Sequence, residues 1–130
     1  MAKINVSGSI VVPNGPQIPF NRSIDVDAYD KIEIPVKAGA KDTKIELQPG
    51  AAGQVQFLAI VSDWYGDDLS FKINTGTDKI TLDQPILCMG TGGVGLFDAA
   101  PKSLLFSNAT AAPGAKDANI QILIGRDATP

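Results

Sequence analysis

The sequence contains no histidine and only one cysteine, and both shortages limit the chemistry that the chain can carry out. Without histidine there is no Ser-His or Cys-His pair, no imidazole metal ligand and no imidazole base that titrates near neutral pH. The most common routes to hydrolysis and zinc catalysis are therefore excluded. The single Cys88 rules out an internal disulfide framework, and its apolar neighbours Leu87 and Met89 indicate a small buried side chain in a protein made in a reducing compartment.

Long hydrophobic runs and basic blocks are missing as well. The longest apolar run, Phe57 to Val61, is much shorter than the roughly 20 residues of a membrane-spanning helix, and no signal peptide is visible. We therefore expect synthesis in the cytoplasm and no membrane partner. The 11 Lys and Arg residues are mixed with 14 Asp and Glu residues along the chain. Because no basic cluster is available to follow phosphates, nucleic acid is not an expected partner.

Alternation of apolar and polar residues is the strongest positive signal in the sequence. In the first stretch it places five residues on one face: Ile4, Val6, Gly8, Ile10 and Val12. This pattern predicts a long strand with one side buried, ending at the turn Pro13-Asn14-Gly15-Pro16. A glycine in the middle of a strand suggests either a bulge or a place where another backbone comes close.

The same pattern recurs at short intervals, separated by many of the 13 glycines and 9 prolines. Further strands are expected at Gln17–Phe20, Ser23–Val26, Lys31–Val36, Lys44–Leu47, Val55–Val61, Leu69–Asn74, Lys79–Leu82, Pro85–Met89, Leu104–Ser107 and Asn119–Gly125. Lys102–Phe106 can also form a short helical turn, and Ala109–Ala118 is expected to be a linker.

These elements predict an all-β fold, in the form of a single-domain antiparallel β-sandwich or barrel. The arrangement is expected to be jelly-roll-like, with about 8–10 short strands. Residues 1–125 are expected to form this one β domain. Residues 126–130 have no periodicity and are expected to form a flexible C-terminal tail.

A glycine-rich segment, Gly90-Thr91-Gly92-Gly93-Val94-Gly95, matches the G-x-G-x-x-G pattern of dinucleotide-binding proteins. That function requires a helix opening at the last glycine, within a βαβ crossover. Here Pro101 follows shortly afterwards, and the remaining residues supply no such crossover. We therefore interpret the segment as a flexible surface loop and expect no cofactor.

The segment from Asp63 to Asp68 admits three interpretations. Its three carboxylates, from Asp63, Asp67 and Asp68, can bind a cation such as calcium, although their spacing is not that of an EF-hand. Trp64 and Tyr65, if exposed, can form a stacking platform for a sugar or for a partner's side chain. Alternatively, the segment is a structural hairpin loop whose tryptophan folds over one end of the core. All three interpretations remain open from the sequence alone.

A second acidic run contains Asp25, Asp27 and Asp30. Two acids on one strand face can divide the acid and base roles of glycoside hydrolysis, but nothing in the sequence places a cleft opposite them. Because aspartate is depleted from strand interiors, we interpret this run as a solvated strand edge. The sequence therefore predicts no catalytic residue, no metal site and no enzymatic activity.

Three stretches carry a resemblance to a known class of proteins: Lys3–Gly8, Gly90–Gly95 and Ala118–Ala128. With them, the chain resembles the small β-rich structural proteins of tailed bacteriophages, and most of all the decoration or cement proteins of the capsid exterior. The resemblance implies a trimeric or dimeric β protein that sits over joints between major capsid proteins and stabilises the shell without catalysis. It also implies a location in the virion, with the major capsid protein and further copies of the chain as partners.

The expected contact regions are the segments with exposed backbone and few competing side chains, residues 1–7, 90–95 and 126–130. The candidate partner contacts within them are Lys3, Ile4, Gly92, Gly93 and Arg126. The alternative hypothesis is a carbohydrate- or receptor-binding β-sandwich module associated with a tail or fibre. In that case Trp64 and Tyr65 are the expected contacts.

Overall fold

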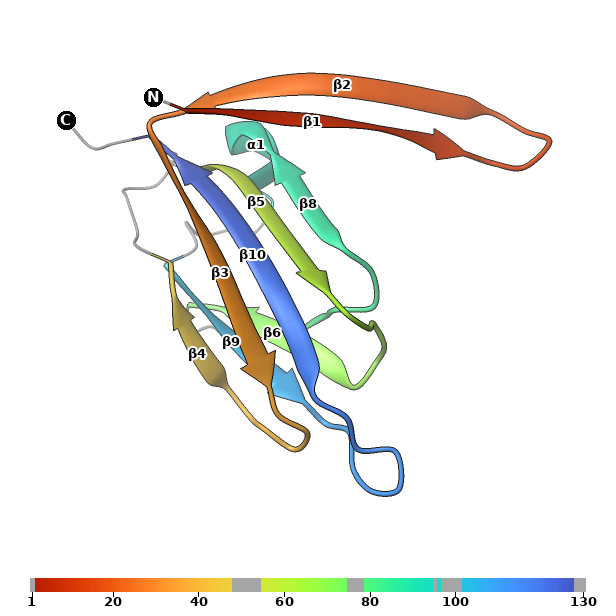
Figure 1. Ribbon diagram of the computed structural model, residues 1–130, viewed down its shortest axis with the longest axis vertical. Coiled ribbons are helices and arrows are strands. Elements are labelled where there is room, and N and C mark those ends of the chain that lie inside the picture. The colour runs from red at the N-terminus through yellow and green to blue at the C-terminus, as the bar shows by residue number, and fades with distance from the viewer. Residues whose placement is uncertain (1, 48–54, 75–78, 95, 97–101, 128–130) are drawn as a thin grey trace.

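The structure is a computed structural model that describes residues 2–47, 55–74, 79–94, 96 and 102–127. In these ranges the chain forms two packed β-sheets, with a two-stranded hairpin projecting from one end (Figure 1). The elements are β1 (Ala2–Val11), β2 (Gln17–Val26), β3 (Ala28–Val36), β4 (Thr43–Glu46), β5 (Val55–Ser62), β6 (Leu69–Ile73), β7 (Ile80–Thr81), β8 (Ile86–Met89), α1 (Gly90–Val94), β9 (Ser103–Asn108) and β10 (Ala118–Arg126).

Eight strands make up the sandwich, in two antiparallel sheets of four. The first sheet has the order β3-β10-β5-β8 and the second the order β4-β9-β6-β7. Counted from β3, these are strands one, eight, three and six against strands two, seven, four and five, which is the order of a jelly roll. The predicted all-β, jelly-roll-like sandwich is therefore confirmed. Within the described residues the sheets keep separate edge strands and do not close into a barrel.

The core lies between the two sheets and is built by the alternating residues. Ile120, Ile122 and Ile124 of the central strand β10 are buried, while Gln121 and Leu123 between them face outward. From the second sheet, the Phe71 and Phe106 rings pack with their centroids 5.7 Å apart. Burying one such side chain contributes roughly 1.5–3 kcal/mol, so the alternating faces determine how the sheets pack.

Two predicted elements differ from those in the structure. The segments Gln17–Phe20 and Ser23–Val26 form one continuous strand, β2, which pairs with β1 in regular register throughout. The helical turn proposed for Lys102–Phe106 is wrong, because this segment contributes to β9. Its alternation directs Leu104 and Phe106 into the core, and β9 pairs with both β4 and β6.

The glycine-rich segment and the C-terminal boundary are also corrected. Residues Gly90–Val94 form the short helix α1 instead of a flexible loop, with Gly90 in the left-handed region at φ 75° and Val94 buried. Arg126 is the last residue of β10, where it is held by the ladder and by an ion pair with Asp30. Gly95 and residues 128–130, which belong to the same two predictions, lie outside the described residues.

The hairpin of β1 and β2, residues 2–26, is called the arm below. Its strands pair from Ala2 opposite Val26 to Val11 opposite Gln17. The register is unbroken at Gly8, so the predicted bulge is absent there; instead the Phe20 ring packs over this glycine, 3.2 Å from where a Cβ would be. The chain passes from the arm into β3 through a single residue, so the base of the arm is tied closely to the sandwich.

Candidate interaction site

The arm has one apolar and one polar face, both set by the register of its strands. The polar face carries pairs such as Asn5 with Ser23, whose hydroxyl donates a hydrogen bond of 2.7 Å to the Asn5 side chain. The apolar face carries the cross-strand pairs Ile4 with Ile24, Gly8 with Phe20 and Ile10 with Ile18, and one charged residue, Arg22, lies on it opposite Val6. Sheet geometry keeps these two sets on opposite sides along the whole arm. The degree of burial, however, differs between the two halves of the apolar face.

The inner half of the apolar face packs on the outer side of the first sheet. A Cβ on Gly125 would lie 2.8 Å from Ile4 Cδ1, 2.9 Å from Val26 Cγ1 and 3.5 Å from Phe57 Cβ, so the glycine allows this close approach. Val26 and Phe57 are both buried. The Asp27 N–H also donates a hydrogen bond of 3.0 Å to the backbone oxygen of the residue after Gly125. The arm is therefore anchored at its base.

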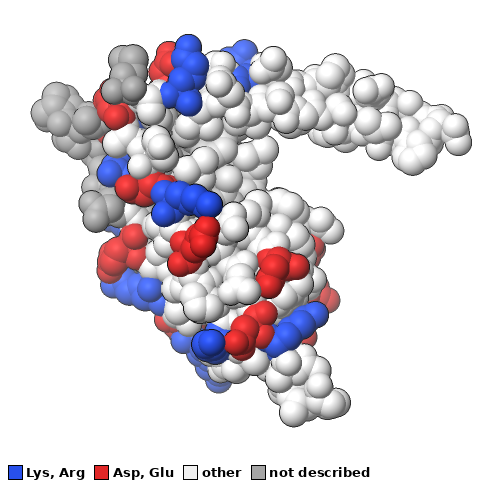
Figure 2. All heavy atoms as spheres, viewed as in Figure 1, with Lys and Arg blue, Asp and Glu red and all other residues white. Residues whose placement is uncertain are grey.

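The outer half of the arm, residues 7–20, is solvent-exposed on almost its whole surface. Ile10 and Ile18 are each 58% exposed, and Val12 is 50% exposed. Residues 4–21 contain no Asp, Glu, Lys or Arg, and Figure 2 shows the projecting part of the arm without charged side chains. The prediction that the strand buries one side is thus wrong for this half. Exposed apolar surfaces of this kind are typical of sites that contact another molecule.

A second apolar surface lies on the outer side of the first sheet. Register places Leu123, Ala59 and Leu87 in one row across β10, β5 and β8, with Val61 two residues along β5. Leu87 is 45% and Val61 37% exposed. A shallow hollow of about 180 Å³ opens among residues that include Ala59, Val61 and Leu123. These four residues, Ala59, Val61, Leu87 and Leu123, are called the sheet patch below.

The structure gathers most predicted contact residues at the arm end of the sandwich. Lys3 is exposed and pairs with Asp25 at 3.7 Å, whereas Ile4 is half-buried in the arm base. Arg126 follows Gly125, which lies beneath the arm, and forms an ion pair with a carboxylate of β3.

Gly92 and Gly93 lie in α1, which contacts β5 and β8. Gly92 is exposed with open space around it, while Gly93 packs beside the Cys88 backbone. Only Gly92 of this pair therefore offers an open surface. Nowhere in the described ranges does a helix have the length and apolarity that crossing a membrane requires.

Trp64 and Tyr65 lie at the other end of β10 and use their polar atoms within the chain. Trp64 Nε1 donates a hydrogen bond of 2.9 Å to the Asp117 backbone oxygen, and Lys116 Nζ lies 4.4 Å from the indole centroid. The Tyr65 hydroxyl accepts a hydrogen bond of 3.0 Å from the Ser62 N–H. Both rings pack against the core. These contacts favour the structural-loop interpretation over a stacking platform.

The acidic residues of the same loop are not arranged around a common point. The Asp63 carboxylate accepts hydrogen bonds from the backbone and side chain of Asn119, at 3.0 and 3.2 Å. In the part of the chain that the structure describes, no group of three or more His, Cys, Asp or Glu side chains is placed to hold a metal ion. Burial raises the pKa of the Cys88 thiol, which disfavours the nucleophilic thiolate. The described residues thus present neither a cluster of metal ligands nor an activated thiol.

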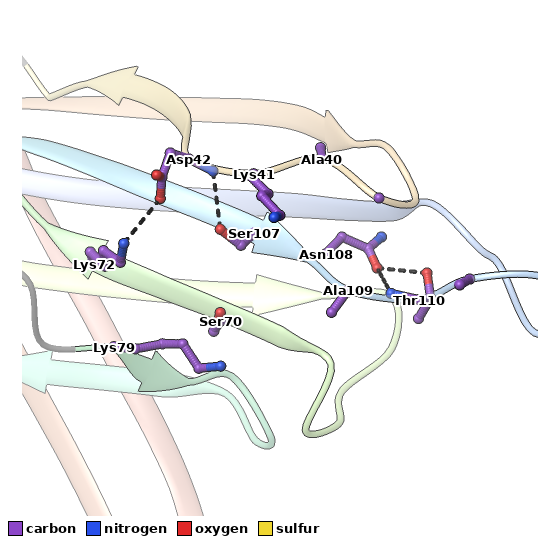
Figure 3. Close-up of a pocket in the computed structure, with 12 residues that line it drawn as sticks. Ala40, Lys41, Asp42, Ser70, Lys72, Lys79, Ser107, Asn108, Ala109 and Thr110 are labelled. Carbon is purple, nitrogen blue, oxygen red and sulfur yellow. Dashed lines mark hydrogen bonds and ion pairs between the residues drawn. The ribbon is translucent and has the colours of Figure 1, made fainter.

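A shallow basin of about 420 Å³ lies on the outer side of the second sheet (Figure 3). Lys41, Lys72 and Lys79 line it, and Lys72 pairs with Asp42 at 3.4 Å. The Asp42 N–H donates a hydrogen bond of 3.0 Å to the Ser107 hydroxyl. Every buried side-chain polar atom among the described residues has a hydrogen-bond partner, so no orphan group marks a ligand position here.

Comparison with known proteins finds no matching family model, no matching curated protein and no matching solved structure. Function must therefore be inferred from the surfaces of this chain. Sequence reasoning missed Ile10 as a contact residue because alternation assigned it to a buried face, and it placed Ile18 in a strand without assigning it to a surface. The signal that distinguishes them is the absence of charge from residues 4–21, which is unusual for a solvent-exposed segment.

Proposed function

We propose that this protein is a non-enzymatic structural component of a virus particle, a decoration or cement protein of the capsid exterior. In this role it binds over joints between major capsid proteins and stabilises the shell. The single observation that carries the proposal is the arm, an ordered hairpin whose apolar face continues beyond the body that covers its base. An uncharged projecting element of this kind is suited to contact between neighbouring subunits.

The fold adds support by analogy. Jelly-roll sandwiches are an architecture of viral capsid domains and also of lectins. Because one fold can serve many functions, this agreement supports the proposal only together with the arm and with the resemblance of the sequence to phage structural proteins.

The mechanism follows from repetition and preorganisation. The arm is already paired into a hairpin, so binding requires little further ordering of its backbone. Each copy then contributes a modest apolar contact, and many copies on one shell hold neighbouring subunits together. Linked contacts of this kind gain affinity through effective concentration, without requiring any single strong site.

The alternative, a carbohydrate- or receptor-binding module, has less support. The Trp64 indole N–H and the Tyr65 hydroxyl, which such a module would present to a ligand, make hydrogen bonds inside the chain. The Lys116 ammonium also lies over one face of the Trp64 ring. Glycan binding would require these contacts to be broken first.

The proposed function is tested by locating the chain in particles purified by density gradient from cells infected with the virus that encodes it. We expect the protein to sediment with the particles at a fixed copy number. Electron microscopy is expected to show its density outside the shell, over joints between capsid subunits. Recovery of the protein only in the soluble fraction of infected cells would overturn the proposal.

Particle stability provides a second readout. Shells that carry the protein are expected to release their nucleic acid at a higher temperature than shells from which it has been omitted. Equal release temperatures with and without bound protein would contradict a stabilising role, even if the protein is part of the particle.

A further inference from the structure

We propose that the partner of the arm is a second copy of this chain, with the outer half of the apolar face seated on the sheet patch of that copy. The inference rests on the proposed function in one respect, since it names the partner of the same arm. It assigns the outer half of the arm to contact between copies of the chain, which links the copies bound on one shell.

The first argument is that the two surfaces match in chemistry. Ile10 and Ile18 are exposed on an arm that has no charged residue from position 4 to 21. The sheet patch is apolar, and the charge that borders it, Lys31, is already paired with Glu33 at 3.0 Å. A charged partner surface would lose the hydration of its charges against the arm or against the sheet patch. Two neutral apolar surfaces can bury one another without that cost. A second copy supplies both surfaces at once.

The second argument is that the arm already packs on this side of the sheet within one chain. Its base covers Phe57 and Gly125, which are paired across β5 and β10. The next pair along the same side is Ala59 and Leu123, and both belong to the sheet patch. The patch is therefore continuous with an apolar contact that the structure contains. An arm from another copy would extend that contact along the same side of the sheet.

The third argument concerns reach and direction. The arm leaves across the end of the first sheet, not down its length, and open space separates its projecting part from the body (Figures 1 and 2). At about 3.3 Å per residue, the outer half extends roughly 15–20 Å beyond its support. This length is sufficient to reach a neighbouring molecule. The hollow of about 180 Å³ in the sheet patch gives an aliphatic side chain from that arm a place to insert.

Contact through the face is favoured over pairing of strand edges. Pro19 lies in β2 opposite Ser9 and has no N–H to donate to a further strand. Proline in an edge strand discourages the addition of another strand from a second molecule. The exposed aliphatic residues lie on the broad face of the arm, so that face carries the contact.

Sedimentation velocity of the isolated full chain over a range of concentrations tests the inference. We expect the wild type to form a dimer or trimer. Ile18→Asp in the arm and Leu87→Asp in the sheet patch are each expected to raise the dissociation constant at least about tenfold. Val11→Asp is the matched control, because Val11 of β1 is exposed like Ile18 but lies on the other face of the arm. It is expected to leave association unchanged.

Mixing the two defective chains distinguishes this contact from other modes of association. A pair of one Ile18→Asp chain and one Leu87→Asp chain retains one intact arm and one intact patch that can meet. We therefore expect the mixture to recover hetero-pairs that neither variant forms alone. Contact of arm with arm would leave every hetero-pair with a defective arm, so failure of the mixture to recover would overturn the inference. Thermal unfolding of each variant establishes that the sandwich remains folded.

The outcomes for the two proposals are separate. A wild-type chain that is monomeric at every concentration but binds particles would overturn the inference and leave the proposed function standing. The binding partner of the arm would then be the capsid protein. A chain that associates as expected but never sediments with particles would support the inference and overturn the proposed function.

Discussion

Gly125 leaves no room for a side chain beneath Ile4, because a Cβ at this position would lie 2.8 Å from Ile4 Cδ1. Val26 Cγ1 lies 2.9 Å from the same point, and its β-branched side chain is buried and has little freedom to move. We therefore expect Gly125→Ala to displace the base of the arm and to lower the free energy of unfolding by about 1–3 kcal/mol. Urea denaturation measures this change.

The matched control for that substitution is Gly92→Ala. Gly92 lies in α1 and is exposed, and outside its own helix nothing lies within 4 Å of the point that an alanine methyl group would occupy. Alanine favours a helix over glycine by up to about 1 kcal/mol, so the free energy of unfolding is expected to stay the same or to rise slightly. If Gly125→Ala proves as stable as Gly92→Ala, the close packing of the arm base is contradicted.

Asn108 is fully buried and holds together the two ends of the segment that leads into β10. Its Nδ2 donates hydrogen bonds to the backbone oxygens of Val36 and Lys116, at 3.1 and 2.7 Å. Its Oδ1 accepts hydrogen bonds from the N–H and hydroxyl of Thr110, at 3.1 and 2.7 Å. Asn108→Ala leaves several buried groups without this partner, so we expect a loss of about 2–4 kcal/mol in the free energy of unfolding.

Asn119→Ala provides the comparison for the buried asparagine. The Asn119 side chain is exposed and donates a hydrogen bond of 3.2 Å to the Asp63 carboxylate. Since water replaces a lost hydrogen bond at the surface, the expected cost is below about 1 kcal/mol. Equal destabilisation by the two substitutions would show that the Asn108 network has no special weight in the fold.

The Lys116 ammonium lies 4.4 Å from the centroid of the Trp64 ring. Trp64 is the only tryptophan in the chain, so tryptophan emission reports the surroundings of this ring alone. Lys116→Ala removes both the cation and the stem that shields the ring, and is expected to shift emission to longer wavelength and to increase quenching by acrylamide. The expected cost in stability is about 0.5–1 kcal/mol. If sugars change the emission of the wild type instead, the carbohydrate-binding alternative gains direct support.

The sequence is sufficient to predict the sheets because the alternation is local. Ile120, Ile122 and Ile124 occupy one face of a strand whatever the rest of the chain does, and their burial against the second sheet follows from hydrophobicity. The same alternation does not show whether another part of the chain covers the apolar face of a strand. Ile10 and Ile18 have the pattern of a buried side, yet no described part of the chain lies over them.

Long-range contacts account for the remaining differences. The sequence places Arg126 in a loose tail because its partner Asp30 is 96 residues away, and no local pattern reveals that pairing. For Trp64, the deciding contacts come from Lys116 and Asp117, which lie in a segment with the composition of a linker. Lys3 and Ile4, which are predicted from the sequence as candidate contacts, lie in the arm, while the exposed apolar extent of the arm depended on the fold.

Asp117 ties the start of β10 to the end of β3. Its carboxylate accepts a hydrogen bond of 3.0 Å from the Ala38 N–H and one of 3.3 Å from Lys37 Nζ. The backbone hydrogen bond, followed by the lysine, lowers the pKa of Asp117 below its ordinary value. A carboxyl group with a lower pKa in the folded state adds stability above its unfolded pKa of about 3.9. That contribution is lost as the pH falls through the folded pKa.

Asp117→Asn is therefore expected to be less stable than the wild type at pH 7, with the difference shrinking below about pH 4 as the wild-type carboxyl becomes protonated. Chemical denaturation of both proteins between about pH 2 and 7 measures the difference. Asp67→Asn serves as the control, because it removes the same charge from an exposed loop position. A difference for Asp117→Asn that is independent of pH, or that grows in acid, would contradict the role assigned to these two hydrogen bonds, since an ionised carboxylate accepts both more strongly than a protonated carboxyl group does.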